Sequence, residues 1–576
     1  MNITKTIAHL HEHSIFSDFD IHFAQLMTEL AHHRHDELLF FTTALLSYFT
    51  AQGHVCLDLT LQAEQIFPVF HETDMEGLQC PPLTSWLEAI HHWSIVGSPQ
   101  SYTPLILDQQ RLYFYRYWDY EQQLARQIHT RLCVPHPYGL STDYSDADEQ
   151  SYLAHRAASS HFCIVSGEPG TGKTVSILKI LIALFKQNAQ YRVALVTPTG
   201  QAAAHLKQTL MTHAHLCDCP PEIRILLPKE VFTLHRLLAI QTHLSHKRSF
   251  SSSLPYDVLI IDEASMVDLS LMTQLTQALP SHARLILVGD PAQLNAIGVG
   301  TVLGDLCYTP SSLLQKQVLS LKKNYRFRSE SGIYQLAQSI KQGNSEVALS
   351  LLKSKQYPDI SWSFLRSFET LSFLLTESII EKFSCYFTEQ TPKNLLQSIE
   401  KFCILCTNQR GQYGVETLNR LIEQKLMDKG WMNTNTRWYP GRPIVITRNA
   451  YTFNLFNGDL GLISRTHSTE LQAIFFSKTS HPYEQQEIRT FLPHQLPEHE
   501  TVYAMTIHKS QGSEFEEVLI VLPEHFSPLL TRELLYTAVT RAKQKVSIWG
   551  NEQVFKQIVS QKVSRTSGLQ EALLRF

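Results

Sequence analysis

The sequence lacks any apolar run long enough to span a bilayer, and it has no N-terminal signal pattern, so neither a membrane protein nor a secreted one is expected. It also lacks an excess of one charge sign, since the formal net charge is only −4. A chain of this kind can bind a polyanion only through a local groove. No internal repeat or long low-complexity tract is evident. Hydrophobic residues make up 43% of the 576, which allows large cores and excludes global disorder.

The ten cysteines are scattered rather than arranged as a disulfide framework, which favours a reducing cytoplasm. Cys403 and Cys406 lie in an apolar, strand-like run with no second pair nearby, so we expect them in a core. Ligand-type side chains also alternate in one short segment, at His213, His215, Cys217 and Cys219. Because the chain contains 28 histidines, such clusters are expected without a metal. A metal site there stays an open, less favoured alternative.

The most informative segment is GEPGTGKT, residues 167–174, which fits the phosphate-binding loop GxxxxGK[ST]. It follows the apolar run at 162–165, which predicts a buried strand, and precedes a predicted helix at 175–184. Glycines let the loop backbone wrap around phosphate oxygens at a helix N-terminus. Lys173 supplies a charge for the β- and γ-phosphates, and Thr174 a hydroxyl for Mg²⁺. The residues expected to contact the nucleotide are Gly167, Glu168, Pro169, Gly170, Thr171, Gly172, Lys173 and Thr174.

Hydrolysis needs a metal anchor and a base as well, and IIDEAS at 260–265 offers both after an apolar strand. Asp262 can hold Mg²⁺, and Glu263 can orient or deprotonate the attacking water. An Asp-Glu pair is more often surface charge, but its place behind a buried strand favours the catalytic interpretation. Gln293 follows the next apolar strand, where its amide can sense the γ-phosphate or its water.

Two arginines stand out further along the chain, Arg326 in NYRF and Arg541 in YTAVTRA. Their planar, permanently charged side chains suit the charge that develops on a transferring phosphoryl group. Either one alone would more often be a structural ion-pair partner. Both lie in or at the start of a second α/β region, so we expect them to reach the nucleotide from there and to couple hydrolysis to domain closure.

Apolar strand candidates alternate with helical segments at 164–165, 193–196, 258–261 and 285–288, which predicts a parallel sheet covered by helices. A second alternating region closes with strands at 518–522 and 546–549. Between about 430 and 500, short strands and turn signals indicate a small β-barrel insert. Residues 1 to 115 show helical spacing and no catalytic signature. The expected fold class is therefore α/β with a mostly helical N-terminal domain.

The order of the motifs resembles that of superfamily-one helicases of the 5′→3′ branch, and within them the RecD family, the α subunits of RecBCD enzymes. The motifs are GEPGTGKT, TPTGQAAAHL, TLHRLL, DEASMVDL, GDPAQL, KNYRF, AMTIHKSQGSEFEEV and ELLYTAVTRAK. Similar connecting segments lie near residues 53–57, 111–113, 442–445, 455–459 and 496–501, so the resemblance covers nearly the whole chain. It implies two RecA-like P-loop NTPase domains and an SH3-like insert in the second. The expected boundaries are a helical partner-docking domain at 1–115, a linker at 116–145, RecA-like domain 1 at 146–322, RecA-like domain 2 at 323–430 and 501–576, and the insert at 431–500.

The resemblance also assigns residues. Gln150 matches the glutamine that reads adenine, which implies ATP, and Gly512 and Glu514 match a motif that meets the nucleotide. The implied catalytic set is Lys173, Asp262, Glu263, Gln293, Arg326 and Arg541, with Thr174 and Asp262 holding Mg²⁺. The implied contacts to single-stranded DNA are Pro198, Thr199, Gly200, His235, Thr506 and His508. A structural role is a serious rival for each DNA contact, and His235 in particular could pack beneath the sheet.

The function implied is that of a cytoplasmic, ATP-dependent 5′→3′ DNA helicase. It would act at single- and double-stranded DNA ends in recombinational repair, in a heterotrimer with RecB-like and RecC-like subunits, with the nuclease in a partner. A stand-alone helicase, an ATP-regulated scaffold and an RNA motor are the alternatives. The sequence departs from the family pattern at Gln201, where lysine is common, at Pro291-Ala292 and in a short 307–319 connection. None of these departures touches the hydrolytic set.

Overall fold

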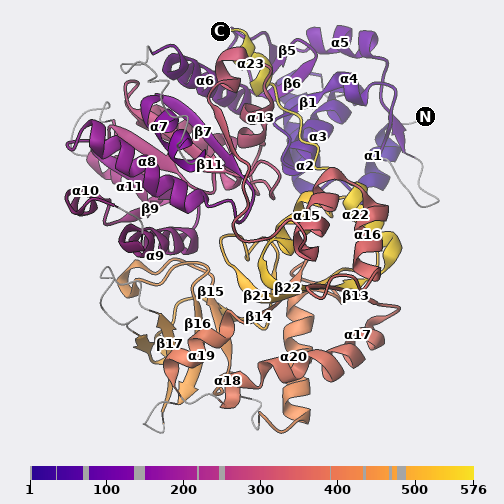
Figure 1. The fold of residues 1–576 in the computed structure, drawn as a ribbon. Helices are drawn as coiled ribbons and strands as arrows, with labels where there is room; N and C mark the ends of the chain where they lie inside the picture. Colours follow the sequence, from indigo (N-terminus) through magenta and orange to yellow (C-terminus); the bar gives the residue numbers. More distant parts are fainter. Residues whose placement is uncertain are drawn as a thin grey trace.

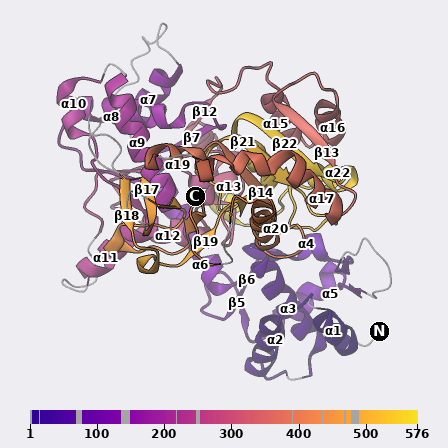
Figure 2. The ribbon, with the colours of Figure 1, turned by 90° about the horizontal axis from the view of Figure 1, so that it is seen from below.

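The computed structural model describes residues 3–13, 15–33, 35–68, 77–134, 149–216, 219–245, 253–388, 391–432, 436–465, 470–476 and 488–576. Two parallel sheets occupy the middle of the molecule, and the N-terminal region gathers at one side (Figures 1 and 2). No helix in the described ranges is both long enough and apolar enough to cross a membrane.

The N-terminal region is helical, as expected, but it also contains a four-stranded sheet in the order β1-β6-β5-β4. Its strands are too short to show an alternating pattern. Ser17 begins the second helix with a capping box, since its hydroxyl accepts from the Asp20 amide while the Asp20 carboxylate accepts from the Ser17 amide. The elements are α1 (Ile3–Glu12), α2 (Asp18–Leu30), α3 (Glu37–Ala51), β1 (Cys56–Asp58), α4 (Leu59–Gln62), β2 (Ile66–Phe67), β3 (Leu78–Gln79), α5 (Leu83–His91), β4 (Val96–Gly97), β5 (Leu105–Asp108) and β6 (Arg111–Phe114).

The stretch expected to be a linker, 116–145, carries the helix α6 (Tyr115–Leu132). This helix buries Leu124, Ala125 and Ile128 in the same core as residues of the first parallel sheet. Arg131, at its end, is fully buried and donates to the carbonyls of Leu279 and Pro280. The helix therefore belongs to the packed body, while residues 135–148 lie outside the described part of the chain.

The first parallel sheet has the strand order β12-β7-β11-β10-β8-β9, and every neighbouring pair is parallel. The predicted strands at 164–165, 193–196, 258–261 and 285–288 and the predicted helix at 175–184 are confirmed. Separate apolar cores cover the two faces of the sheet, which explains why its strands are apolar throughout. The elements are α7 (Glu149–Ser159), β7 (Phe162–Gly167), α8 (Lys173–Gln187), β8 (Val193–Thr197), α9 (Gly200–Leu216), α10 (Pro221–Leu226), β9 (Val231–Thr233), α11 (Leu234–Ser245), β10 (Val258–Ile261), η1 (Ala264–Met266), α12 (Leu269–Ala278), β11 (Arg284–Gly289), α13 (Val302–Tyr308), α14 (Ser312–Gln315) and β12 (Val318–Leu321).

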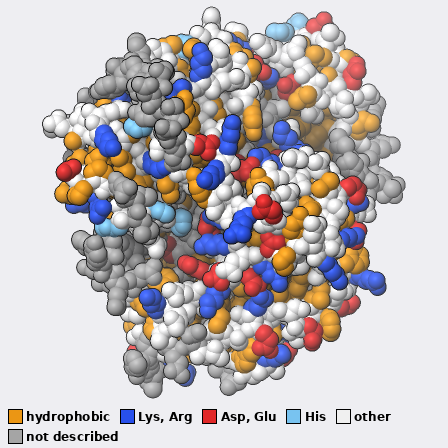
Figure 3. All heavy atoms as spheres, viewed as in Figure 1, with side chains coloured by type: hydrophobic (Ala, Val, Ile, Leu, Met, Phe, Trp, Pro, Cys, Tyr) orange, Lys and Arg blue, Asp and Glu red, His pale blue; other side chains and the backbone are white. Residues whose placement is uncertain are grey.

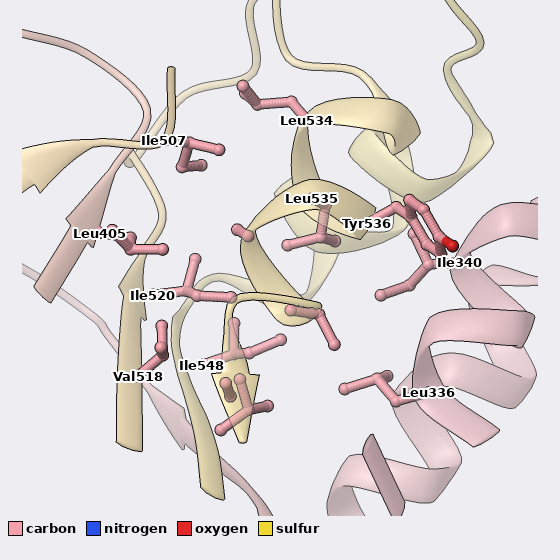
Figure 4. Packing of buried hydrophobic residues seen from close by; sticks show 14 of the residues in the cluster. Leu336, Ile340, Leu405, Ile507, Val518, Ile520, Leu534, Leu535, Tyr536 and Ile548 are labelled. Carbon is pink, nitrogen blue, oxygen red and sulfur yellow. The ribbon is translucent and has the colours of Figure 1, made fainter. Parts of the chain in front are cut away.

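The second parallel sheet has the order β13-β22-β21-β14-β20. One of its two cores packs α15 and α21 against β21 and β22, with Leu336, Ile340, Leu535 and Ile520 among the residues in contact (Figure 4). Cys403 and Cys406 are buried in β14, which confirms the core interpretation. The elements are α15 (Gly332–Gln342), α16 (Ser345–Lys353), β13 (Ile360–Phe364), α17 (Phe368–Leu374), η2 (Leu375–Ile379), η3 (Ile380–Phe383), α18 (Cys385–Thr388), α19 (Pro392–Ile399), β14 (Phe402–Cys406), α20 (Val415–Asp428), β20 (Ala504–Thr506), β21 (Phe515–Val521), α21 (Arg532–Val539), β22 (Ala542–Gly550) and α22 (Glu552–Ser560).

Between α20 and β20 the chain forms an antiparallel sheet in the order β18-β17-β16-β15-β19, around a small core of its own. Gly461 is needed there because a Cβ would meet the Phe475 ring at 2.4 Å. The elements are β15 (Pro443–Ile446), η4 (Tyr451–Phe453), β16 (Leu460–Arg465), β17 (Leu471–Phe476), β18 (Ile488–Phe491), η5 (Pro493–Gln495) and β19 (His499–Thr501).

After α22 the chain returns to the N-terminal region and ends in α23 (Leu569–Leu574), beside α6 and α13 (Figure 1). The Val55 amide donates to the Thr566 carbonyl at 2.8 Å, and Arg575 forms a two-point ion pair with Asp108. Arg565 donates to the carbonyls of three residues after β11, namely Ala296, Gly298 and Gly300. The last sixteen residues thus fasten the second sheet to the N-terminal region and to the first sheet.

Candidate active site

The loop at 167–174 lies between β7 and α8, as the motif requires. Gly170 and Gly172 have φ angles of 87° and 78°, a backbone conformation that only glycine adopts without strain. The Thr171 hydroxyl and amide both donate to the Glu168 carbonyl, which tightens the loop. The Lys173 ammonium donates to the Gly167 carbonyl at 2.9 Å. The loop is therefore closed by a hydrogen bond between the Lys173 side chain and the main chain of its first residue.

Gln150 lies at the edge of this loop. It is buried on α7, and its side-chain amide donates to the Thr171 carbonyl at 3.3 Å. A Cβ on Gly172 would stand only 2.5 Å from the same amide nitrogen. The side chain assigned to adenine recognition thus contacts the phosphate-binding loop directly.

Two carboxylates follow strand β10 at the same edge of the sheet. Asp262 is buried, and its carboxylate accepts from the Glu263 amide at 2.9 Å. Glu263 itself has a positive φ of 53°, which turns the chain sharply after the strand. Burial raises the pKa of Asp262, the Glu263 charge raises it further, and Lys173 opposes the shift. Asp262 therefore lies within electrostatic range of the loop lysine.

The loop that follows β11 contacts α21 of the second sheet, and we call the contacts between this loop and the second-sheet region the seam. Asp290 accepts from the Gln293 side chain at 3.3 Å and from the Tyr536 hydroxyl on α21 at 3.1 Å. The Leu294 amide donates to the Thr537 hydroxyl at 2.9 Å. Burial raises the pKa of Asp290, and Lys173 opposes this shift as well. The seam thus adjoins the loop lysine.

Arg541, predicted to reach the nucleotide from the second region, lies in the seam. Its guanidinium is buried and donates to the carbonyls of Thr537 and Ser513, at 3.1 and 3.3 Å. A longer contact of 3.5 Å joins it to the Gln293 side-chain oxygen. Burial lowers the pKa of Arg541, while the charge of Glu263 opposes the shift. The arginine is therefore close to both the carboxylate pair and Gln293.

Arg326 approaches the phosphate-binding loop from the other side. The Asn324 side chain donates to the Pro169 carbonyl at 2.9 Å, and the Tyr325 amide donates to the Gly170 carbonyl at 2.8 Å. A Cβ on Gly170 would meet the Arg326 Cβ at 2.6 Å. The structure thus places both arginines beside the loop or the carboxylates.

Glu514 is the ion-pair partner of Arg326. Burial alone would raise the pKa of its carboxyl, but Arg326 and Arg541 outweigh burial and lower it. Gly512, two residues earlier, has a φ of 82°, and its backbone lies against Ala202 of α9. This segment therefore connects the second sheet to the first near the arginines.

The candidate DNA contacts lie at the ends of β8, β9 and β20. Gly200 approaches the insert so closely that a Cβ would stand 2.6 Å from the Phe456 Cβ. Thr506 is buried and accepts from the Lys509 amide, whereas His235 is exposed, so it does not pack beneath the sheet. Burial and Arg565 lower the pKa of His508. The remaining two, Pro198 and Thr199, are half-buried, and the Thr199 hydroxyl caps α9 by accepting from Ala202.

Several contacts in this region could not be predicted from any sequence motif. Gln201, noted as a departure from the family pattern, donates to the Ser513 hydroxyl at 2.6 Å and lies against Gly458 of the insert. Tyr536 lies within the motif ELLYTAVTRAK, but the motif does not indicate that its hydroxyl donates to Asp290. On the face shown in Figure 3, acidic and basic side chains are interspersed, in keeping with the small net charge.

No metal site is evident at the histidine–cysteine cluster in the part of the chain that the structure describes. His215 contacts Arg224 at 3.2 Å, and Cys219 points toward the Pro220 carbonyl. Cys217 lies outside the described residues. Among described residues, no group of three or more His, Cys, Asp or Glu side chains is placed to hold a metal ion.

The phosphate-binding loop and the carboxylate pair, together with Arg326 after β12 and Arg541 after α21, form the nucleotide site expected of a nucleotide-using helicase. Family models agree: an AAA domain matches residues 146–357, and a UvrD-like helicase C-terminal domain matches residues 501–549. The N-terminal domain of the RecBCD enzyme subunit RecD matches residues 12–113.

Curated relatives match over nearly the full length. The RecBCD enzyme subunit RecD of Mycolicibacterium smegmatis is 33% identical, with 97% of this chain and 98% of that protein covered. The RecD subunit of Haemophilus influenzae is 29% identical, with 98% of each chain covered. The ATP-dependent RecD2 DNA helicase of Deinococcus radiodurans is 26% identical over 74% of this chain and 53% of its own length. The chain belongs to the RecD family.

Proposed function

We propose that this chain is an ATP-dependent 5′→3′ DNA helicase and translocase, the RecD subunit of a RecBCD-type helicase–nuclease that acts on double-stranded DNA ends in recombinational repair. One observation carries the proposal: the two parallel-sheet regions meet at the nucleotide site, where Arg326, after β12, lies beside Gly170 of the phosphate-binding loop and Arg541, after α21, contacts Gln293. Such a site changes its contacts when the two sheets move, so nucleotide turnover can drive movement along a strand. The direction of travel rests on the family resemblance.

ATP fits the site through Gln150, whose amide can both donate to and accept from an adenine edge. The residues also fit Mg²⁺, because Asp262 is a buried carboxylate beside a second carboxylate, and the charge of Lys173 acts on Asp262. Thr174 and Asp262 would hold the ion, which would neutralise charge on the transferring phosphoryl group. Glu263 would take the proton of the attacking water, and the arginines would stabilise the developing negative charge.

Single-stranded DNA would run over the ends of β8, β9 and β20, where six residues are expected to contact it. Their mixture of small polar, glycine and histidine residues suits sugar–phosphate contacts and stacking rather than base-edge readout, so binding without sequence preference follows. The contacts are Pro198, Thr199, Gly200, His235, Thr506 and His508.

We assign the domains as 1–115 for partner docking, 146–322 and 323–430 with 501–576 as RecA-like domains 1 and 2, and 431–500 as an SH3-like insert. The antiparallel sheet of the insert supports the last assignment. RecB-like and RecC-like subunits complete the heterotrimer, and the described cysteines, which are not joined in disulfides, suit a cytoplasmic location.

An exposed apolar stripe on α2 supports docking through the N-terminal region. Phe19, Leu26 and Leu30 are 71%, 50% and 48% exposed, and Phe23 stacks on Phe19, so one helix face is apolar. Leu26→Asp should prevent copurification with the RecB-like and RecC-like subunits and leave the ATPase of the isolated chain intact. The matched control is Ile225→Asp, because Ile225 is also an apolar side chain and is 76% exposed on α10. Copurification of the Leu26 variant at the wild-type level contradicts this docking face.

Lys173→Ala tests the motor itself. We expect the purified chain to hydrolyse ATP faster when single-stranded DNA is added, and Lys173→Ala to abolish turnover while circular dichroism is unchanged. Lys186→Ala, an exposed lysine at the far end of the same helix α8, is the control and should behave as wild type. Unchanged turnover in Lys173→Ala refutes this loop as the catalytic site.

The same assay separates the alternatives. A scaffold that uses ATP as a regulatory ligand would show no stimulation by DNA, and an RNA motor would respond equally to RNA. A stand-alone helicase would unwind DNA without the partner subunits and would not copurify with them.

A further inference from the structure

Glu168 places a carboxylate in the phosphate-binding loop, the segment that takes up a polyanionic triphosphate in the proposed function. Its two oxygens are both engaged by helix α15 of the second sheet. Lys341 donates to one oxygen at 2.5 Å, and Gln338 donates to the other at 2.7 Å. The donors are three residues apart, so they project from one face of α15.

The opposite face of α15 fixes where these donors stand. Leu336 and Ile340 are completely buried, and their helix packs against α21 and β22 (Figure 4). Because the helix is anchored in that core, Lys341 and Gln338 are presented to the loop by the body of the second sheet rather than by a mobile surface segment.

We propose that Lys341 and Gln338 are positioning residues for ATP binding, which neutralise Glu168 and hold its carboxylate away from the triphosphate. The proposal rests on the proposed ATP site and names residues of the second sheet that act on it through the loop. Neither residue contacts the nucleotide in this account; both act on the carboxylate of Glu168.

The electrostatics of the pair support this role. The side chains of Glu168 and Lys341 are 23% and 35% exposed, so the pair is partly shielded from water. Burial alone would lower the pKa of Lys341, but Glu168 and Asp290 outweigh burial and raise it. Lys341 is therefore a cation held between two carboxylates, one in the loop and one in the seam.

Replacing Lys341 by an uncharged residue tests whether it neutralises Glu168. In Lys341→Met the stem keeps its apolar contacts, but Glu168 becomes an uncompensated negative charge beside the triphosphate. One such charge in a partly exposed site should weaken ATP affinity about tenfold. A packing defect, in contrast, would weaken binding whether or not Glu168 carries a charge.

The experiment measures the Kd of a fluorescent methylanthraniloyl ATP analogue and the kcat of ATP hydrolysis. Lys341→Met should raise Kd about tenfold and leave the saturated kcat within about twofold, because the catalytic groups are untouched. Lys341→Arg should retain wild-type affinity. The double variant Glu168→Gln/Lys341→Met should recover the affinity of Glu168→Gln, since the loop then carries no carboxylate for Lys341 to neutralise.

Lys556→Met is the matched control, because the ion pair of Lys556 with Glu346 at 2.7 Å joins α22 to α16 within the second-sheet region rather than to the loop. Wild-type affinity in Lys341→Met, or a double variant as weak as Lys341→Met, overturns the proposal. Nucleotide binding is read without DNA, so a failure of the helicase assignment would appear instead as absent DNA stimulation in the wild-type chain.

Discussion

The C-terminal segment is fastened by a buried carboxyl whose ionisation should make the attachment sensitive to pH. Glu121 on α6 is completely buried and accepts from the Ser567 hydroxyl at 2.7 Å and from the Gly568 amide at 3.0 Å. Burial raises the pKa of its carboxyl from 4.5 to about 8. The charged groups that face it are Asp305 of α13, which raises the pKa further, and Arg111 of β6, which lowers it.

The sign of the effect follows from proton linkage. The folded state holds the proton of Glu121 up to about pH 8, whereas the unfolded state releases it near pH 4.5. The stabilisation is therefore fully present below pH 4.5 and is lost as the pH rises through the folded pKa. Between about pH 5.5 and about pH 8, this single group should remove about 3 kcal/mol from the free energy of unfolding.

Glu121→Gln isolates this contribution, because glutamine keeps an acceptor for Ser567 and Gly568 and does not ionise. The difference in Tm between the variant and the wild type should be small at about pH 5.5 and should favour the variant by about two to three degrees at about pH 8, because a chain of this length has a large entropy of unfolding. Hydrogen exchange of residues 561–576 should show the same trend, with similar protection in both proteins at about pH 5.5 and faster exchange in the wild type at about pH 8. Asp119→Asn, a partly exposed site on the same helix, should keep the wild-type pH dependence. A Tm difference that does not change with pH would refute the buried, proton-linked carboxyl.

Three further results are expected at the nucleotide site. Gly172→Ala should weaken nucleotide binding by more than about tenfold, because φ is 78° and the new Cβ would stand 2.5 Å from the Gln150 amide. Gly430→Ala, with a similar φ of 75° and no atom within 4 Å of the new Cβ, should leave binding unchanged in the same titration. Arg541→Lys should lower DNA-stimulated kcat about 1,000-fold with little change in nucleotide Kd, since the forked guanidinium is lost but the charge remains; turnover near the wild-type rate would remove Arg541 from the catalytic set. Gln150→Ala should abolish the preference for ATP over GTP in competition assays, and a preserved preference would show that adenine is read elsewhere.

The sequence predicts the first parallel sheet well because its physical cause is local. Strands covered on both faces must be apolar along their whole length, so runs such as 193–196 and 258–261 are visible without any partner. The N-terminal sheet was not visible, since β4 contains two residues and β1 three, too few to show a period. The helix α6 was hidden for another reason. Its charged and aromatic residues resemble a linker, and only the core beneath α12 shows which face is buried.

The site divides in the same way. Glycine conformations and strand ends are set within a few residues, so the loop and the carboxylate pair could be assigned from their order alone. The contacts between the two parallel-sheet regions could not, because Glu168 and Lys341 are 173 positions apart, and Asp290 and Tyr536 are 246 apart. Nothing in either local sequence specifies such a pairing. It exists only after two separately packed cores fix the helices that carry the donors.

This division also explains why two arginines predicted from similar motifs are held so differently. Arg326 forms an ion pair with Glu514 and a longer contact of 3.4 Å with the Thr540 carbonyl, whereas Arg541 donates to the main-chain carbonyls of Thr537 and Ser513. The ion pair of Arg326 joins two side chains, so both charges can be removed together by substituting both residues. A carbonyl partner is part of the backbone and stays unsatisfied when the guanidinium is removed, which costs free energy in a buried position. The family motif specifies the same residue type twice, but only the packing of α21 against the loop after β11 decides that Arg541 is also part of the framework that joins the two sheets.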